Sequence, residues 1–163
     1  MMKIKNIITI LVFGIFFATC KQEKKEEVTS TKPVLKNYLI GTWETTYLKI
    51  EYLTANETDS TSIFEDDFSK PNSGKAQSIY KNDGTFKAWF VKADGKKVSE
   101  TDGKWKTSGD SLFVDYPYLG KQVQAWYTIT QTKKGFNATS IYDWDSDGES
   151  DDTLLMKTKK IEL

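Results

Sequence analysis

Residues 76–92 read AQSIYKNDGTFKAWFVK, two short runs rich in β-branched and aromatic residues separated by Asn82-Asp83-Gly84. In the second run Phe86, Ala88 and Phe90 fall on one side, which is the two-residue period of a half-buried strand. Asparagine, aspartate and glycine readily adopt the positive φ angles of tight hairpin turns. The stretch therefore predicts an antiparallel β-hairpin.

The same pattern extends outward in both directions. It predicts eight strands, at about residues 42–53, 76–81, 85–92, 97–107, 111–116, 122–131, 136–142 and 153–160. Residues 34–40 suit one short helical turn. Strands joined mostly by short hairpins favour an all-β, eight-stranded up-and-down antiparallel barrel, which has no open edges, and a two-sheet sandwich is the alternative. A barrel of this size is filled by side chains or holds one small ligand.

Four short motifs give the chain a family resemblance. Gly41-Thr42-Trp43 resembles the Gly-x-Trp signature of lipocalins, and three further motifs follow in the order seen in bacterial lipocalin-like domains: Asp83-Gly84-Thr85-Phe86, Gly103-Lys104-Trp105 and Gly109-Asp110-Ser111-Leu112. The resemblance implies a barrel with Trp43 packed at its closed end. The chain has no arginine to cover that tryptophan, as animal lipocalins often do, so either a lysine replaces it or the closed end differs.

The N-terminus resembles a bacterial lipoprotein signal. Lys3 and Lys5 precede an apolar run over residues 7–17, and Phe17-Ala18-Thr19-Cys20 follows the pattern of a lipobox. The resemblance implies that residues 1–19 are removed and that Cys20 carries the lipid, palmitate among its acyl chains. The alternatives are an uncleaved anchor, for which the run is short, and an ordinary signal peptide with a chance cysteine.

Residues 20–33 are charged and show no apolar periodicity, which predicts a disordered tether ahead of a domain at 34–163. Its acids Glu23, Glu26 and Glu27 resemble a lipoprotein surface-export signal, and a solvated spacer is the equal alternative. We therefore expect a lipid-anchored protein of the bacterial cell envelope, at the outer membrane and in one reading exposed on the surface.

The composition excludes several chemistries. All 23 basic residues are lysines, there is no histidine, Cys20 is the single cysteine, and the formal net charge is zero. Triads with a histidine base, histidine metal sites and arginine clamps are thereby ruled out. No basic excess or motif suggests nucleic-acid binding. No acid–base pair forms a recognisable motif, so we expect no enzymatic activity.

Strand parity places the two long connections, residues 54–75 and 143–152, at the same end of the predicted barrel. This mouth would be acidic, with Glu57, Asp59, Glu65, Asp66 and Asp67 in one connection and Asp143, Asp145, Asp147, Glu149, Asp151 and Asp152 in the other. Binding residues concentrate in loops. Alternatively, the acids only keep the protein soluble.

The second connection contains a calcium-like spacing. Its residues 143–148, Asp-Trp-Asp-Ser-Asp-Gly, resemble the start of an EF-hand loop, with Asp151 at the ninth position. Leu154 stands where that loop requires glutamate. The candidate calcium ligands are thus Asp143, Asp145, Asp147 and Asp151, and the alternative is an ordinary hairpin turn.

Three functions remain open. The first is a carrier of a small, apolar ligand in a cavity lined by Trp43, Phe86, Phe90, Tyr116 and Tyr127. The second is a filled barrel that docks a protein or glycan through its loops or through Trp89 and Trp126, which the alternation places on the outer face. The third is a calcium-stabilised structural lipoprotein.

Overall fold

The structure is a computed structural model that describes residues 34–53, 60–118 and 120–162. The expected signal peptide, Cys20 and the tether lie outside these residues, as do Glu57 and Asp59. Within the described part of the chain, no helix is long and apolar enough to cross a membrane.

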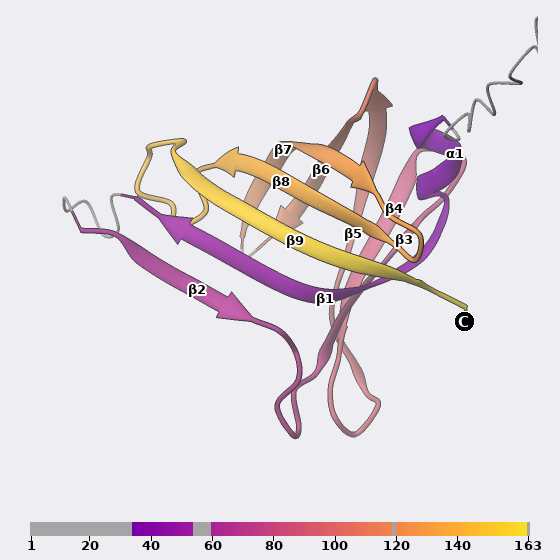
Figure 1. Cartoon of the computed structure of the whole chain (residues 1–163), viewed down its shortest axis with the longest axis horizontal. Helices are drawn as coiled ribbons and strands as arrows, with labels where there is room; N and C mark the ends of the chain where they lie inside the picture. The colour runs from indigo at the N-terminus through magenta and orange to yellow at the C-terminus, as the bar shows by residue number, and fades with distance from the viewer. Residues whose placement is uncertain (1–33, 54–59, 119, 163) are drawn as a thin grey trace, which may run out of the picture. The chain divides into compact units, whose positions relative to one another are not determined.

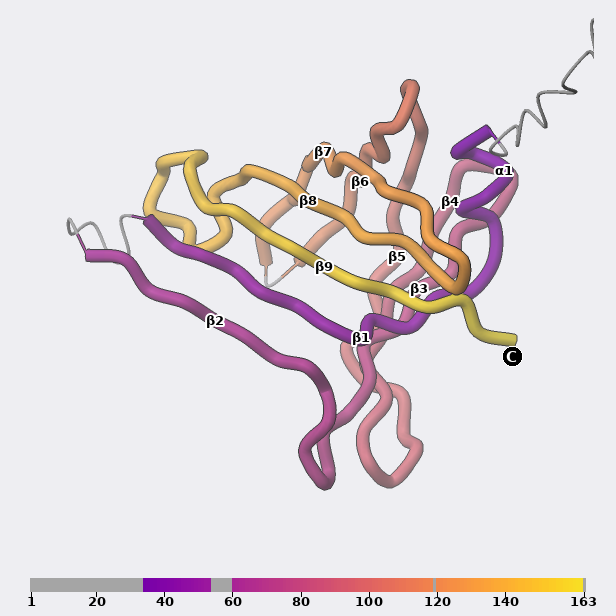
Figure 2. The backbone as a smooth tube through the Cα atoms, viewed as in Figure 1, coloured from indigo at the N-terminus to yellow at the C-terminus, as the bar shows by residue number. Residues whose placement is uncertain are grey.

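The described residues form one short helix and nine strands (Figures 1 and 2). The elements are α1 (Leu35–Leu39), β1 (Gly41–Tyr52), β2 (Ser62–Asp66), β3 (Lys75–Tyr80), β4 (Thr85–Val91), β5 (Lys97–Ser108), β6 (Ser111–Tyr118), β7 (Lys121–Gln131), β8 (Phe136–Tyr142) and β9 (Asp152–Ile161). Eight of the nine strands correspond to the predicted ones, and β8 matches at both ends.

Closure of the sheet comes from its first and last strands. β1 pairs antiparallel with β9 from Thr42 opposite Ile161 to Glu51 opposite Thr153, and Figure 1 shows the two strands side by side. With β3 to β9 paired in sequence order, β1 completes an eight-stranded up-and-down antiparallel barrel. The predicted lipocalin-like fold class is therefore confirmed over the alternative sandwich.

Strand β2 was not predicted. It pairs with the second half of β1, Leu48 opposite Asp66 and Tyr52 opposite Ser62, on the same edge that β3 pairs near Gly41. Figure 2 shows β2 running beside β1. Four of its five residues are exposed, so its sequence carries no alternation of buried and exposed positions. Pairing with β1, rather than a local signal, makes this segment a strand.

The strand β6 is longer than predicted. It continues through Pro117 to Tyr118, which pairs with Lys121 across the β6–β7 turn. Proline lacks an N–H donor and so suggested the end of the strand. Its carbonyl oxygen nevertheless accepts a hydrogen bond from Thr101 Oγ1 at 2.8 Å, which keeps the segment extended beside β5.

The closed end of the barrel is filled and covered by α1. Trp43 is 1% exposed, donates its indole N–H to the Leu39 carbonyl at 2.7 Å, and packs edge-on against Phe136 at 4.9 Å. Lys160 Nζ lies 5.3 Å from the centroid of the Trp43 ring. A lysine thus takes the covering position that the family resemblance left open.

Candidate functional site: the barrel mouth and the β8–β9 connection

The end of the barrel opposite the closed one, here called the mouth, is where β1 ends and β9 begins. Glu51 pairs with Thr153, so Tyr52 lies beside Asp152 at the start of β9. The connections that follow β1 and β8 therefore leave the barrel at the same end, as strand parity predicts. Residues 143–151 form the second of these connections.

The predicted acidic mouth is wrong in part. Glu65 and Asp66 belong to β2, which runs from the mouth along the side of the barrel because it pairs antiparallel with β1. Glu65 accepts a hydrogen bond from the Tyr47 hydroxyl at 2.8 Å, and Asp67 caps the next turn through the Ser69 N–H at 3.0 Å. Of the described acids, those in the β8–β9 connection remain at the mouth.

Two aspartates of the β8–β9 connection converge with the first residue of β9. One carboxylate oxygen from each of Asp143, Asp145 and Asp152 lies within 4.8 Å of the others. Asp152 is 1% exposed, and its Oδ2 accepts the backbone N–H groups of Trp144 at 2.7 Å and Asp145 at 3.1 Å. These two bonds fold the connection back onto the first residue of β9.

The converging set differs from the predicted calcium ligands. It contains Asp143 and Asp145 but has Asp152 in place of Asp147 and Asp151. Asp147 Oδ1 instead accepts the Glu149 N–H at 2.8 Å. The sequence did hold a signal for Asp152, because alternation in β9 places it on the inward face with Leu154, which is 6% exposed.

Trp144 connects the loop to the barrel interior. It stands between Asp143 and Asp145 in the chain, and its ring lies 4.9 Å from Tyr142 and 6.3 Å from Tyr127 between centroids. The ring is half-buried against the core cluster, and its Nε1–H is buried without a hydrogen-bond partner. Spacing alone did not single out Trp144 as a functional residue.

A second buried polar group lies on the inward face of β8. Ser140 is 4% exposed and alternates with Ala138, which is fully buried, and with Tyr142. Its Oγ has no hydrogen-bond partner. Buried hydroxyl groups are almost always hydrogen-bonded in proteins, so Ser140 Oγ is unusual, as is the indole N–H of Trp144.

Tyrosines supply the other polar groups of this region. Burial raises the pKa of Tyr116 to about 12, with smaller contributions from Tyr118 and Tyr142, and Tyr116 is hydrogen-bonded to Tyr127. Burial likewise raises the pKa of Tyr127 well above its ordinary value. Burial also raises the pKa of Tyr52, with added effects from Asp152 and Asp145. These phenols stay neutral at physiological pH.

Of the five residues expected to line a cavity, Phe86, Tyr116 and Tyr127 are in contact in that order, and Trp43 and Phe90 lie elsewhere. Trp43 lies at the filled closed end. Phe86 is 4% exposed, stacked on Tyr80 at 5.6 Å and edge-on to Tyr116 at 5.4 Å. Phe90 packs on Gly74, where an added Cβ would lie 2.0 Å from its ring. Tyr127 is the one that contacts Trp144, at 6.3 Å between ring centroids, and Tyr116 is hydrogen-bonded to Tyr127.

Phe90 also borders an open depression on the surface. The depression has a volume of about 340 Å³ and is lined by Asn72, Gly74, Phe90, Lys92, Ala93 and Asp94. It lies between the β4–β5 turn and the segment that leads into β3. It contains neither the unsatisfied groups nor the aspartate cluster.

Of the two tryptophans expected to be exposed, Trp126 is exposed and Trp89 is not. Trp126 is 45% exposed, 5.0 Å from Phe113 between ring centroids, with Lys106 Nζ 4.9 Å from the Phe113 ring. Trp89 is only 5% exposed, although it does lie on the outer face. Lys97 Nζ covers its ring at 4.3 Å.

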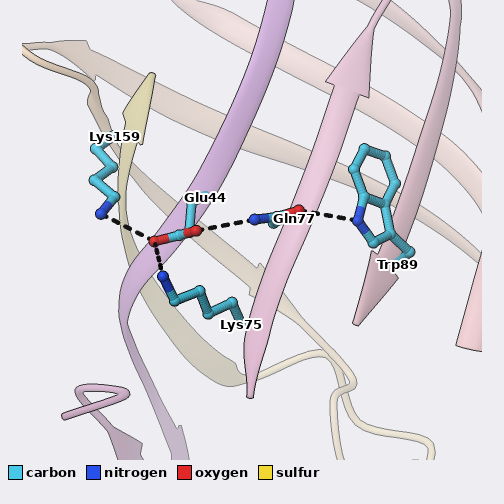
Figure 3. A network of polar contacts seen from close by, with 5 residues as sticks. All are labelled: Glu44, Lys75, Gln77, Trp89 and Lys159. Atoms are coloured by element: carbon cyan, nitrogen blue, oxygen red, sulfur yellow. Dashed lines mark hydrogen bonds and ion pairs between the residues drawn. The ribbon is translucent and has the colours of Figure 1, made fainter. Parts of the chain in front are cut away.

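Trp89 is held by a row of polar residues across the outer face (Figure 3). Its Nε1 donates to Gln77 Oε1 at 3.0 Å, and Gln77 Nε2 donates to Glu44 Oε2 at 2.9 Å. Glu44 Oε1 pairs with Lys159 at 2.9 Å and Lys75 at 3.6 Å. Alternation predicted the face correctly, but this row removes Trp89 from the contact patch.

No protein-family model matches the sequence, and no curated protein matches it significantly.

Proposed function

We propose that this protein is a non-enzymatic binding protein, anchored to an envelope membrane through Cys20, that holds a small ligand beneath Trp144 at the mouth of its lipocalin-like barrel. The observation that carries the proposal is the pair of buried, unpartnered groups, Ser140 Oγ and Trp144 Nε1. A buried donor without a partner costs about 1–3 kcal/mol. A bound molecule that accepts these hydrogen bonds recovers that cost.

The surroundings define the class of ligand. The rings of Tyr127, Tyr142 and Trp144 offer apolar faces, while the raised pKa values of Tyr116 and Tyr127 keep their hydroxyls neutral. The ligand that fits best is a small neutral molecule with a largely apolar body and at least one hydrogen-bond acceptor.

Native mass spectrometry of the full-length protein, extracted in mild detergent, tests this function. We expect a small-molecule adduct on the wild type and on Thr139→Ala, an exposed neighbour on β8 that serves as the control. Ser140→Ala and Trp144→Phe should each weaken retention about tenfold, the value of one hydrogen bond.

A wild-type protein without any adduct, in which the two groups hold only water, would contradict the carrier function. The outer face would then be the remaining candidate, because Trp126 is exposed beside Phe113 and Lys106.

A further inference from the structure

We propose that Asp143, Asp145 and Asp152 bind one calcium ion, and that this ion holds Trp144 in place over the barrel mouth. The site is separate from the small-ligand site, and its test does not depend on any ligand being found.

The first argument is the charge that the three aspartates bring together. Their nearest carboxylate oxygens lie within 4.8 Å of one another, and among the described residues no lysine forms an ion pair with any of them. Asp152 is 1% exposed, so water screens its charge poorly, while Asp143 and Asp145 are half-buried. Like charges this close beside a buried carboxylate are stabilised when a cation lies between them.

The second argument concerns individual oxygen atoms. Asp143 Oδ2 accepts the Gly148 N–H at 3.2 Å, and Asp145 Oδ1 accepts the Asp147 N–H at 3.1 Å. The other oxygen of each carboxylate, Asp143 Oδ1 and Asp145 Oδ2, is fully buried and receives no hydrogen bond. An anionic oxygen shielded from water and without a donor requires a positive partner. The two unpartnered oxygens belong to residues of the converging set.

The ligand type selects the ion. The set is made only of carboxylate oxygens, which suit hard cations, and it contains no histidine or cysteine. Calcium accepts six to eight oxygens in flexible geometry, so three carboxylates together with backbone carbonyls or water can satisfy it. Magnesium demands a near-ideal octahedron and retains its own waters. The loop therefore fits calcium better.

Calcium binding should also fix the Trp144 side chain at the barrel mouth. Trp144 lies between two of the ligands, and its backbone N–H and that of Asp145 donate to the third, Asp152. A bound calcium ion would offset the negative charge of the three aspartates and should keep them together. The indole then stays against Tyr142 and Tyr127. Without calcium, repulsion between the carboxylates should loosen the loop and release the ring.

The experiment is a calcium titration of the full-length protein, extracted in mild detergent and freed of metal with a chelator. Isothermal titration calorimetry should show saturable binding of one calcium ion, with a rise in melting temperature. Tryptophan fluorescence should shift to shorter wavelength. Asp145→Asn keeps an oxygen for the Asp147 N–H and removes one charge, so it should weaken binding at least tenfold. Asp94→Asn is the matched control, because Asp94 caps another turn through the Lys96 N–H at 2.9 Å.

Trp144→Phe separates the two parts of the proposal. It should leave the calorimetric signal intact and abolish the fluorescence shift. No saturable heat at millimolar calcium, or an equal response to magnesium at the same ionic strength, would overturn the site. A fluorescence shift that persists in Trp144→Phe would overturn its link to the mouth.

Discussion

Glu44 shows how a charged residue is kept in the wall of the barrel. It is 6% exposed, yet it lies on the outer face, between Gln77 on one side and Lys159 on the other. Burial by itself raises the pKa of Glu44. Hydrogen bonds from Lys159 and Gln77, and the charges of Lys159 and Lys75, outweigh burial and leave the pKa below its ordinary value of 4.5.

The sign of this shift predicts how stability depends on pH. Because the folded pKa is depressed, the ionised Glu44 stabilises the fold above the ordinary value, and this contribution is lost as the pH falls through the folded pKa. Glu44→Gln should therefore lower the free energy of unfolding by about 1–3 kcal/mol at neutral pH. The difference from wild type should shrink in acid, as measured by urea denaturation at both pH values.

Glu100→Gln is the control for this prediction, because the Glu100–Lys87 pair is exposed and such pairs contribute little. An equal loss of stability for Glu44→Gln at acid and neutral pH would show that packing, rather than ionisation, explains the role of Glu44.

Among the described strands, β2 has the weakest support from neighbouring strands. It pairs with β1 alone among the described strands, and Ile63 and Phe64 are 57% and 45% exposed. β1 already pairs with β9 along its other edge. The closed barrel therefore does not depend on β2, which can open locally without global unfolding.

Phe64→Pro should release β2 and leave the barrel folded. Proline fixes φ and its ring disturbs the pairing of a strand, so hydrogen exchange should speed up at residues 62–66 while the free energy of unfolding falls by about 1 kcal/mol. Ile129→Pro is the contrasting variant, because Ile129 pairs with Ala138 of β8 and donates its backbone N–H to the Asp110 carbonyl at 2.8 Å. It should prevent folding. Global unfolding of Phe64→Pro would mean that β2 is an integral wall strand.

For the molecule as a whole, the two ends of the barrel have different chemistry. The closed end contains Leu39, Trp43 and Phe136, each at most 1% exposed. The mouth contains a buried aspartate, neutral tyrosines and several buried polar atoms without a hydrogen-bond partner, Ser140 Oγ and Trp144 Nε1 among them. Such atoms are rare in native proteins, and their presence at the mouth is what supports the proposed binding role.

The anchoring that we propose for the whole molecule depends on a single side chain, Cys20. Cys20→Ser should abolish incorporation of labelled palmitate and move the protein from the membrane fraction to the soluble fraction. Cys20 is the only cysteine, so this variant cannot break a disulfide. Unchanged partitioning of Cys20→Ser would favour an uncleaved apolar anchor over the lipid.

Much of the fold could be predicted because its signals are local. The turns at Gly84 and Gly95 require positive φ angles, 83° and 82° in the structure, and the alternation of Phe136, Ala138 and Ser140 is readable within one strand. Such signals also predicted that the connections after β1 and β8 share one end. They could not reveal β2, whose residues become a strand only because β1 presents an unpaired edge.

The tertiary structure was needed for the features that depend on partners distant in the chain. Asp152 joins Asp143 and Asp145 because the pairing of β8 with β9 returns the chain to the same point. Trp89 is buried because Gln77 and Lys97 come from strands on either side of it. Local propensity acts over a few neighbouring residues, whereas burial, charge convergence and unsatisfied hydrogen bonds arise only when the register between strands is set.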